Sequence, residues 1–180
     1  PGASSISLDE EISRFKMSLP FLKLFPRKQF SIDTTKYEVA KFAVDKGFSI
    51  INDISSGIDP KMFKLAAKKN TKIILMHMIG TPKTMQDNLK NNLTIESIVS
   101  FFNEKIKYAV NYGIDKNNII IDPGIGFGKT IDENYMILNN LDEIINLGFP
   151  VLVGISRKSF LEYSKDKPID RLSATIGASS

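Results

Sequence analysis

Two patterns of hydrophobic and polar positions alternate along the chain. Short runs rich in Ile and Val end in small or polar residues, as buried strands do, and the longer segments between them have apolar residues at helical spacing. The pattern predicts strands at residues 29–32, 49–51, 72–76, 118–121 and 150–155. It predicts helices at residues 7–19, 36–46, 60–69, 94–112 and 132–147, and a last helix that starts near Arg171. This alternation indicates βα repeats around a parallel sheet.

Local signals and strand composition refine this prediction. Ser7 followed by Glu10 suggests a capping box at the start of the first helix, which Pro20 is expected to stop. Near-continuous apolar strands are buried on both faces, as in a (β/α)8 TIM barrel or a flavodoxin-like doubly wound sheet. The pattern does not choose between these two α/β folds. No linker or shift in composition divides residues 1–180, so a single domain is expected.

Polar side chains stand at the ends of most predicted strands. Asp33, Asn52 and Asp122 end three strands, and the turn at residues 156–159 follows another. Active sites lie at the carboxyl ends of the strands in both candidate folds, so these groups are expected to converge on one pocket. Two carboxylates, an amide and the Lys158 ammonium suit a flat heterocycle, because a carboxylate accepts two parallel N–H bonds from an amino-pyrimidinone edge. Alternatively, the two aspartates only cap the helices that follow.

The glycine-rich segment at residues 122–130 matches neither common phosphate-binding pattern. A Walker A loop needs glycine where Pro123 stands, and the dinucleotide fingerprint needs glycine where Lys129 stands. We expect the glycines to turn the backbone sharply and to allow close approach to a ligand. Phe127 either packs against an aromatic ring of that ligand or covers the core.

Several further residues have two interpretations each. Arg157 and Lys158 form either an anion site before a helix N-terminus or a solvated basic turn. Met76 either touches a flat ring or fills a gap in the core. His77 is the only histidine, which excludes a multi-histidine zinc site, and a structural role is expected for it. The chain has no cysteine, which excludes disulfides and thiolate chemistry.

The net charge of +4 comes from 24 basic and 20 acidic residues. It reflects either a lysine-rich solvated surface or an electrostatic preference for anionic substrates. The basic residues are scattered without interleaved aromatics, so nucleic acid is not an expected partner. No apolar run approaches the roughly 20 residues of a membrane span, and no signal peptide is recognisable. A cytoplasmic protein without membrane contact is therefore expected.

Taken together and in this order, six segments resemble dihydropteroate synthase. They are residues 31–34, 50–53, 75–78, 80–86, 122–129 and 153–159. The resemblance implies a pterin-binding (β/α)8 barrel of which this chain holds about strands three to seven, as a partial domain truncated at both ends. It also implies the reaction, in which 6-hydroxymethyl-7,8-dihydropterin diphosphate and p-aminobenzoate give 7,8-dihydropteroate and diphosphate.

The resemblance further implies roles for individual residues. Pterin contacts are implied for Asp33, Asn52, Met76, Asp122 and Lys158. Positions bordering p-aminobenzoate are implied at Phe127, Lys158 and Ser159. Lys158 and Asp122 would be the catalytic pair, acting through electrostatics and orientation. Mg²⁺ would neutralise the diphosphate, but its ligand in the family lies on the first strand, so this chain is expected to hold no metal ligand.

The same resemblance sets expectations for the isolated chain. The family's first two strands and its last, which carries the Arg-x-His diphosphate site, have no counterpart in residues 1–180. We therefore expect this chain alone to be inactive and its full-length parent to be a homodimer. Two alternatives are a methyltetrahydrofolate–corrinoid methyltransferase and a non-catalytic pterin-binding remnant. The segments at residues 80–86 and 156–159 favour the synthase over the methyltransferase.

Overall fold

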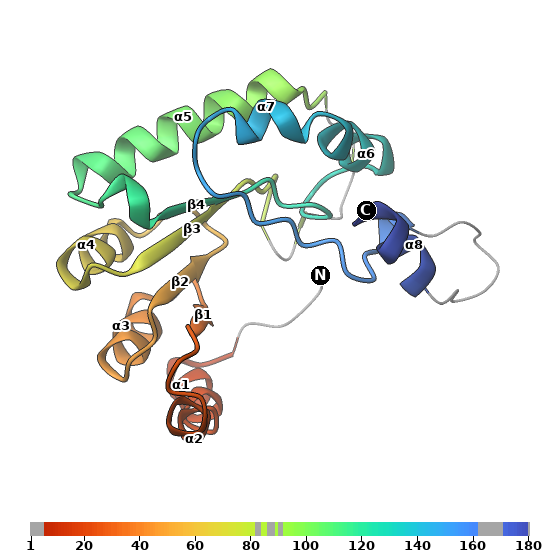
Figure 1. The fold of residues 1–180 in the computed structure, drawn as a ribbon. Coiled ribbons are helices and arrows are strands. Elements are labelled where there is room, and N and C mark those ends of the chain that lie inside the picture. Colours follow the sequence, from red (N-terminus) through yellow and green to blue (C-terminus); the bar gives the residue numbers. More distant parts are fainter. Residues whose placement is uncertain (1–5, 82–83, 86–88, 90–91, 162–170, 180) are drawn as a thin grey trace.

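Four parallel strands form one curved sheet (Figure 1). The computed structural model describes residues 6–81, 84–85, 89, 92–161 and 171–179, without the side chain of residue 172. The strands are β1 (Ser31–Asp33), β2 (Ile50–Asp53), β3 (Lys72–Met76) and β4 (Ile119–Asp122). Their order in the sheet is their order in the chain, β1-β2-β3-β4. This order is that of a barrel wall, whereas a flavodoxin-like sheet reverses its strand order at a switch point.

Helices connect the strands and lie along one side of the sheet (Figure 1). The connecting helices are α3 (Tyr37–Asp45), α4 (Pro60–Lys69) and α5 (Ile95–Asn111). The elements before β1 are α1 (Leu8–Lys16) and α2 (Leu19–Leu24). The later elements are α6 (Ile131–Asn139), α7 (Leu141–Ile145), α8 (Leu172–Ala178) and the 3-10 turns η1 (Lys116–Asn118) and η2 (Ser159–Leu161). Over the described residues, each helix is too short or too polar to cross a membrane.

The register gives the two faces of the sheet different roles. Asp33 pairs with Asn52, Asn52 with Ile74, and Met76 with Asp122. Since side chains alternate along a strand, the pairing puts Asp33, Asn52, Met76 and Asp122 on one face. The opposite face consists of the half-buried Ile32 and the fully buried Ile51, Ile73, Leu75, Ile119 and Ile121, with Asp53 at its end. The helices therefore cover the apolar face, and the polar strand ends are left on the inner face of the arc.

The strand predicted at residues 150–155 is wrong. This segment makes one isolated bridge, Ile121 to Val151, so the sheet of the described residues has four strands. The Ile121 N–H donates to the Pro150 carbonyl (3.0 Å), and the Leu152 N–H donates to the Ile121 carbonyl (2.9 Å). A longer parallel ladder would next need N–H donors from Pro123 and from Pro150. Neither residue has one, so the pairing ends on both sides.

Two predicted helix boundaries are also wrong. The single helix expected over residues 132–147 is divided into α6 and α7 at Asn140. The Asn140 side chain donates to the Met136 carbonyl (2.7 Å) and takes the place of the backbone N–H that would continue the helix. Helix α1 ends at Lys16 and not at Leu19. Pro20, which was expected to stop it, lies in the first turn of α2, where a missing N–H costs no hydrogen bond.

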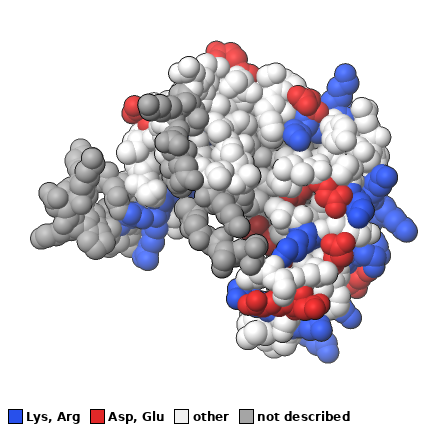
Figure 2. All heavy atoms as spheres, turned by 180° about the vertical axis from the view of Figure 1, so that it is seen from behind, with Lys and Arg blue, Asp and Glu red and all other residues white. Residues whose placement is uncertain are grey.

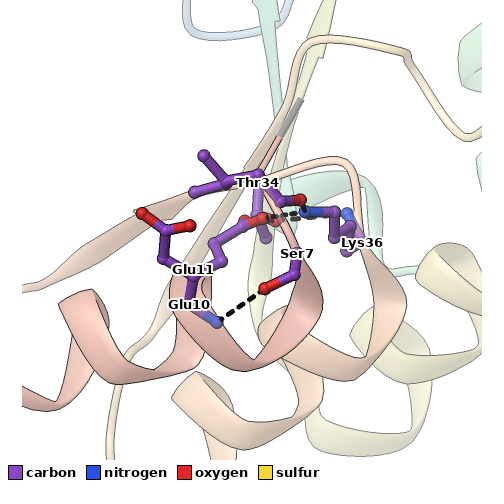
Figure 3. Close-up of polar contacts among 6 residues, drawn as sticks. Ser7, Glu10, Glu11, Thr34 and Lys36 are labelled. Carbon is purple, nitrogen blue, oxygen red and sulfur yellow. Dashed lines mark hydrogen bonds and ion pairs between the residues drawn. The ribbon is translucent and has the colours of Figure 1, made fainter. Parts of the chain in front are cut away.

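The start of α1 agrees in part with the predicted capping box. The Ser7 hydroxyl accepts from the Glu10 N–H (3.2 Å), as expected (Figure 3). The Glu10 carboxylate, however, pairs with Arg14 one turn along the helix (2.5 Å). The cap therefore stabilises the helix through the serine side chain.

Candidate functional site

Asn52 presents an unused acceptor on the inner face of the sheet. Its Oδ1 atom is shielded from solvent and has no hydrogen-bond partner among the described residues. A buried acceptor without a donor costs roughly 1–3 kcal/mol, so a ligand N–H placed there would be stabilised. Asp33 lies beside it in register. Asp33 is exposed as a residue, but partial burial of its carboxyl, followed by the nearby charges of Glu11 and Asp53, raises the pKa of that group.

Helix α1 is anchored to the chain directly after Asp33 (Figure 3). The Glu11 carboxylate accepts from the Thr34 hydroxyl (2.5 Å) and pairs with the Lys36 ammonium (2.5 Å). The Thr34 N–H donates to the Asn52 carbonyl (3.1 Å). The residue that follows Asp33 is thus tied both to α1 and to the neighbouring strand, which limits the movement of the two polar strand ends.

Asp122 and Lys158 form the other side of the site. An Asp122 oxygen accepts from the Gly124 N–H (2.7 Å). Burial raises the pKa of Asp122, against the opposing effects of the Gly124 hydrogen bond and of Lys158. Burial lowers the pKa of Lys158, against the opposing charge of Asp122. The Lys158 ammonium donates to the Ile125 carbonyl (2.7 Å) and lies 4.3 Å from the centre of the Phe127 ring. The two predicted catalytic residues therefore influence each other's charge.

The glycine-rich loop after β4 turns sharply, as expected. Its glycines come close to the backbone of the segment that follows β3. Gly124 and Gly128 have positive φ angles, +67° and +70°. A Cβ atom on Gly124 would lie 2.0 Å from the His77 carbonyl oxygen, and one on Gly128 would lie 2.1 Å from that of Ile79. The glycines thus allow this loop to pack directly on the chain that follows β3.

A cavity of about 360 Å³ lies beside this loop. Its lining residues are Met85, Gly126, Phe127, Arg157, Lys158, Ser159 and Arg171. It therefore brings together the three residues for which a position beside p-aminobenzoate is implied. Phe127 lines the cavity and contacts a lysine, so it is more than a cover of the core.

Arg157 is held by α8. Its backbone is left-handed (φ 52°), its N–H donates to the Thr175 hydroxyl (3.0 Å), and its carbonyl accepts from Arg171 (3.1 Å). The helix N-terminus expected after Arg157 is a single 3-10 turn, so its dipole is small. Any anion affinity of the cavity comes from its basic side chains. On the face shown in Figure 2, basic and acidic side chains are intermingled. This distribution agrees with the interpretation of the net charge as a solvated surface.

His77 has the environment of a structural residue. It is buried, its ring packs edge-on against Phe101 (4.9 Å between centroids), and its backbone N–H donates to the Asp122 carbonyl (2.9 Å). Burial and then the charge of Lys129 lower the pKa of His77 to about 3. The imidazole is therefore neutral at physiological pH.

The loops of the site are held by residues that were not predicted from the sequence. Asn134 accepts from the Gly126 N–H (2.6 Å) and donates to the Thr130 carbonyl (2.7 Å). Glu133 accepts from the Thr130 N–H (2.8 Å) in a capping box at the start of α6. The Thr130-x-x-Glu133 spacing was a visible signal for this box. Asp53 is also buried; it accepts from three donors in the loop between β2 and α4.

Comparison with known proteins identifies the family. The family model described as pterin binding enzyme matches residues 1–180. Dihydropteroate synthase of Synechocystis sp. is 41% identical over 172 residues, 93% of this chain and 58% of that protein. Among solved structures, dihydropteroate synthase from Stenotrophomonas maltophilia has a TM-score of 0.89 at 34% identity and covers 97% of this chain and 66% of its own. The Thermus thermophilus enzyme in complex with 4-aminobenzoate has a TM-score of 0.87 at 31% identity, with 97% and 68% covered.

The shared fold extends over nearly the whole chain, although the chain spans only about 58% of the length of the Synechocystis relative. The four-stranded sheet with its helices is therefore part of a (β/α) barrel. Since the family model matches every residue, and the strand ends put their polar side chains on one inner face, this chain belongs to the pterin binding enzymes.

Proposed function

We propose that this chain carries the pterin pocket and part of the p-aminobenzoate pocket of a dihydropteroate synthase. The reaction is the transfer of a dihydropterin methylene group to the amine of p-aminobenzoate in folate synthesis. The observation that carries the proposal is the common inner face of Asp33, Asn52 and Asp122, with Lys158 within electrostatic reach of Asp122. The similarity to dihydropteroate synthases over 93% of the chain supports it.

The inner face offers the acceptors that a pterin needs. The free Asn52 Oδ1 accepts one ring or amino N–H, and the carboxylates of Asp33 and Asp122 accept others. The ammonium of Lys158 donates to a ring carbonyl or nitrogen. Met76 pairs with Asp122 in register and supplies an apolar surface beside the ring.

The cavity beside Phe127 suits an aromatic acid. Phe127 offers a ring face, Ser159 a hydroxyl, and the charges of Lys158, Arg157 and Arg171 favour a carboxylate. The relative from Thermus thermophilus in complex with 4-aminobenzoate supports this assignment. Lys158 would thus contact both ligands, since it lines the proposed p-aminobenzoate site and also belongs to the proposed pterin site.

The proposed chemistry is a substitution at carbon. The bond from the methylene carbon of the pterin to the diphosphate oxygen breaks, the electron-rich pterin stabilises the resulting methylene cation, and the amine nitrogen of p-aminobenzoate forms a bond to that carbon. The electron pair leaves with diphosphate, and the amine loses a proton to water. Lys158 stabilises the departing negative charge, and Asp122 holds the pterin in place.

Mg²⁺, when bound, would neutralise the negative charge of the leaving diphosphate. Among the described residues, no three His, Cys, Asp or Glu side chains gather closely enough to form a metal site. The proposed roles of this chain's own residues are to hold the pterin, to orient p-aminobenzoate and to stabilise the departing charge.

Calorimetry with 6-hydroxymethylpterin tests the proposal. We expect binding to the chain and a loss of about tenfold or more in affinity for Asp122→Asn, since one charge-assisted hydrogen bond is weakened. Asp142→Asn, an equal charge change at an exposed position of α7, is the matched control and should bind normally. Equal affinities of the two variants, or no binding by the unmodified chain, would overturn the proposal.

A second titration separates a pocket of the synthase from a binding remnant. The full-length parent is titrated with the pterin and then with the pterin diphosphate and Mg²⁺, and a remnant would gain little affinity from the diphosphate. We also expect no turnover by the 180-residue chain. Measured formation of 7,8-dihydropteroate would refute that expectation.

A further inference from the structure

Lys129 is a buried cation between the two loops that carry the proposed site. The residue is 3% exposed. The ammonium donates to the carbonyl oxygens of His77 (2.9 Å), Gly124 (2.9 Å) and Phe127 (3.2 Å). An ammonium has three N–H donors, and here each has a main-chain acceptor. Such an arrangement joins three points of the backbone at a single atom.

Each of these three points adjoins a residue of the proposed site. His77 directly follows Met76 at the end of β3. The Gly124 N–H donates to the Asp122 carboxylate (2.7 Å). Phe127 lines the cavity and lies under the Lys158 ammonium. Movement of the three carbonyls would therefore move the pterin side and the p-aminobenzoate side together.

The loop after β4 has reason to need such an anchor. It contains three glycines with positive φ angles, and glycine backbones lose the most conformational freedom on ordering. The segment after β3 makes two main-chain hydrogen bonds to this loop. The His77 N–H donates to the Asp122 carbonyl (2.9 Å), and the Ile79 N–H donates to the Phe127 carbonyl (3.4 Å). The Lys129 ammonium adds further bonds between the same two segments, through the carbonyls of His77, Gly124 and Phe127. Three carbonyl dipoles offset the cost of burying its charge.

We propose that Lys129 is a positioning residue, which holds Gly124 and Phe127 against the end of β3 and thereby sets the geometry of both ligand pockets. This inference rests on the proposed function for its ligands. It assigns no contact between Lys129 and substrate, because the ammonium is buried and used by the backbone.

The charges around Lys129 make the anchor sensitive to pH. Burial lowers the pKa of Lys129 to about 7, while Asp122 and Glu133 raise it and Lys158 lowers it further. The neutral imidazole of His77 is the remaining titratable group beside it. A neutral amine keeps two N–H donors, so one of the three carbonyls loses its hydrogen bond above this pH. Ligand affinity should therefore fall as the pH rises through about 7.

Three variants test the proposal by calorimetry with 6-hydroxymethylpterin and with p-aminobenzoate from about pH 6 to pH 9. Lys129→Met should weaken both ligands by about tenfold or more and remove the pH dependence that the lysine causes. Lys129→Arg keeps a permanent cation, so affinity should be partly rescued and flat over this range. Lys107→Met, at an exposed position of α5, is the matched control and should behave as the unmodified chain.

Amide hydrogen exchange gives a readout that needs no ligand. In Lys129→Met, exchange should accelerate by about tenfold or more at Gly124, Gly126 and Phe127 and stay unchanged in α4. If the unmodified chain binds pterin and Lys129→Met has the same affinity and pH profile, the positioning role is wrong and the proposed function stands. If the unmodified chain binds no pterin, the proposed function fails. The role of Lys129 is then judged by exchange alone, and it is wrong if Lys129→Met leaves the exchange rates of the loop unchanged. If Lys129→Met does not fold, Lys129→Arg provides the test. A pH profile and loop exchange rates identical to those of the unmodified chain would show that the positioning role is wrong.

Discussion

Replacing Gly124 by alanine is expected to destabilise the chain more than a glycine substitution at an open position. Gly124 has φ +67°, a left-handed conformation that costs an L-residue roughly 1–2 kcal/mol. The added Cβ would also lie 2.0 Å from the His77 carbonyl oxygen. Real Cβ atoms essentially never show contacts under 3.0 Å. The loop after β4 must therefore move away from the chain after β3 by about 1 Å, which is the difference between 3.0 Å and 2.0 Å.

The magnitude follows from these two effects. Forced backbone shifts in a packed region typically cost about 1–3 kcal/mol, which adds to the conformational cost. The expected loss for Gly124→Ala is therefore about 2–5 kcal/mol, a large part of the roughly 5–15 kcal/mol that stabilises a typical domain. Separation of the loops would also disturb the hydrogen bond from the Gly124 N–H to Asp122, so pterin affinity should fall.

Urea unfolding followed by far-UV circular dichroism measures the loss, with the free energy extrapolated linearly to water. Gly148→Ala is the matched control, because Gly148 has φ +80° and nothing within 4 Å of the added Cβ. It should lose only the conformational part, roughly 1–2 kcal/mol. If the two variants lose the same free energy, the contact with His77 does not restrict this loop, and the reasoning is wrong.

Two further predictions concern buried polar groups. The pKa of His77 is lowered to about 3 from 6.5, so its contribution to stability is complete above pH 6.5 and is lost as the pH falls toward 3. NMR of the imidazole should show no titration between about pH 5 and 8, and an inflection near neutral pH would contradict this. Asp53→Asn should cost about 2–3 kcal/mol in urea unfolding, since the fully buried carboxylate accepts from Ser55 twice and from Gly57. A loss within the error of the measurement would show that these bonds do not stabilise the loop.

The sequence by itself determined the repeating βα units and the candidate site. Helical and strand spacing are local properties, since they follow from which side of each element is buried. Asp33, Asn52 and Asp122 could be located because parallel strands present their carboxyl ends at one edge in either candidate fold. The family resemblance, carried by segments along the whole chain, agrees with the family match to residues 1–180.

The hydrophobic pattern left two α/β sheets open, and the family resemblance implied the barrel. The tertiary structure confirms the barrel through its strand order, which depends on contacts between segments far apart in the chain. The prolines at 123 and 150 are visible in the sequence, but their effect depends on the register that would require their missing N–H groups. Lys129 was likewise visible as a lysine. Its role depends on three carbonyls, one of which comes from a strand end 52 residues earlier, and spacing along the chain cannot reveal such a meeting.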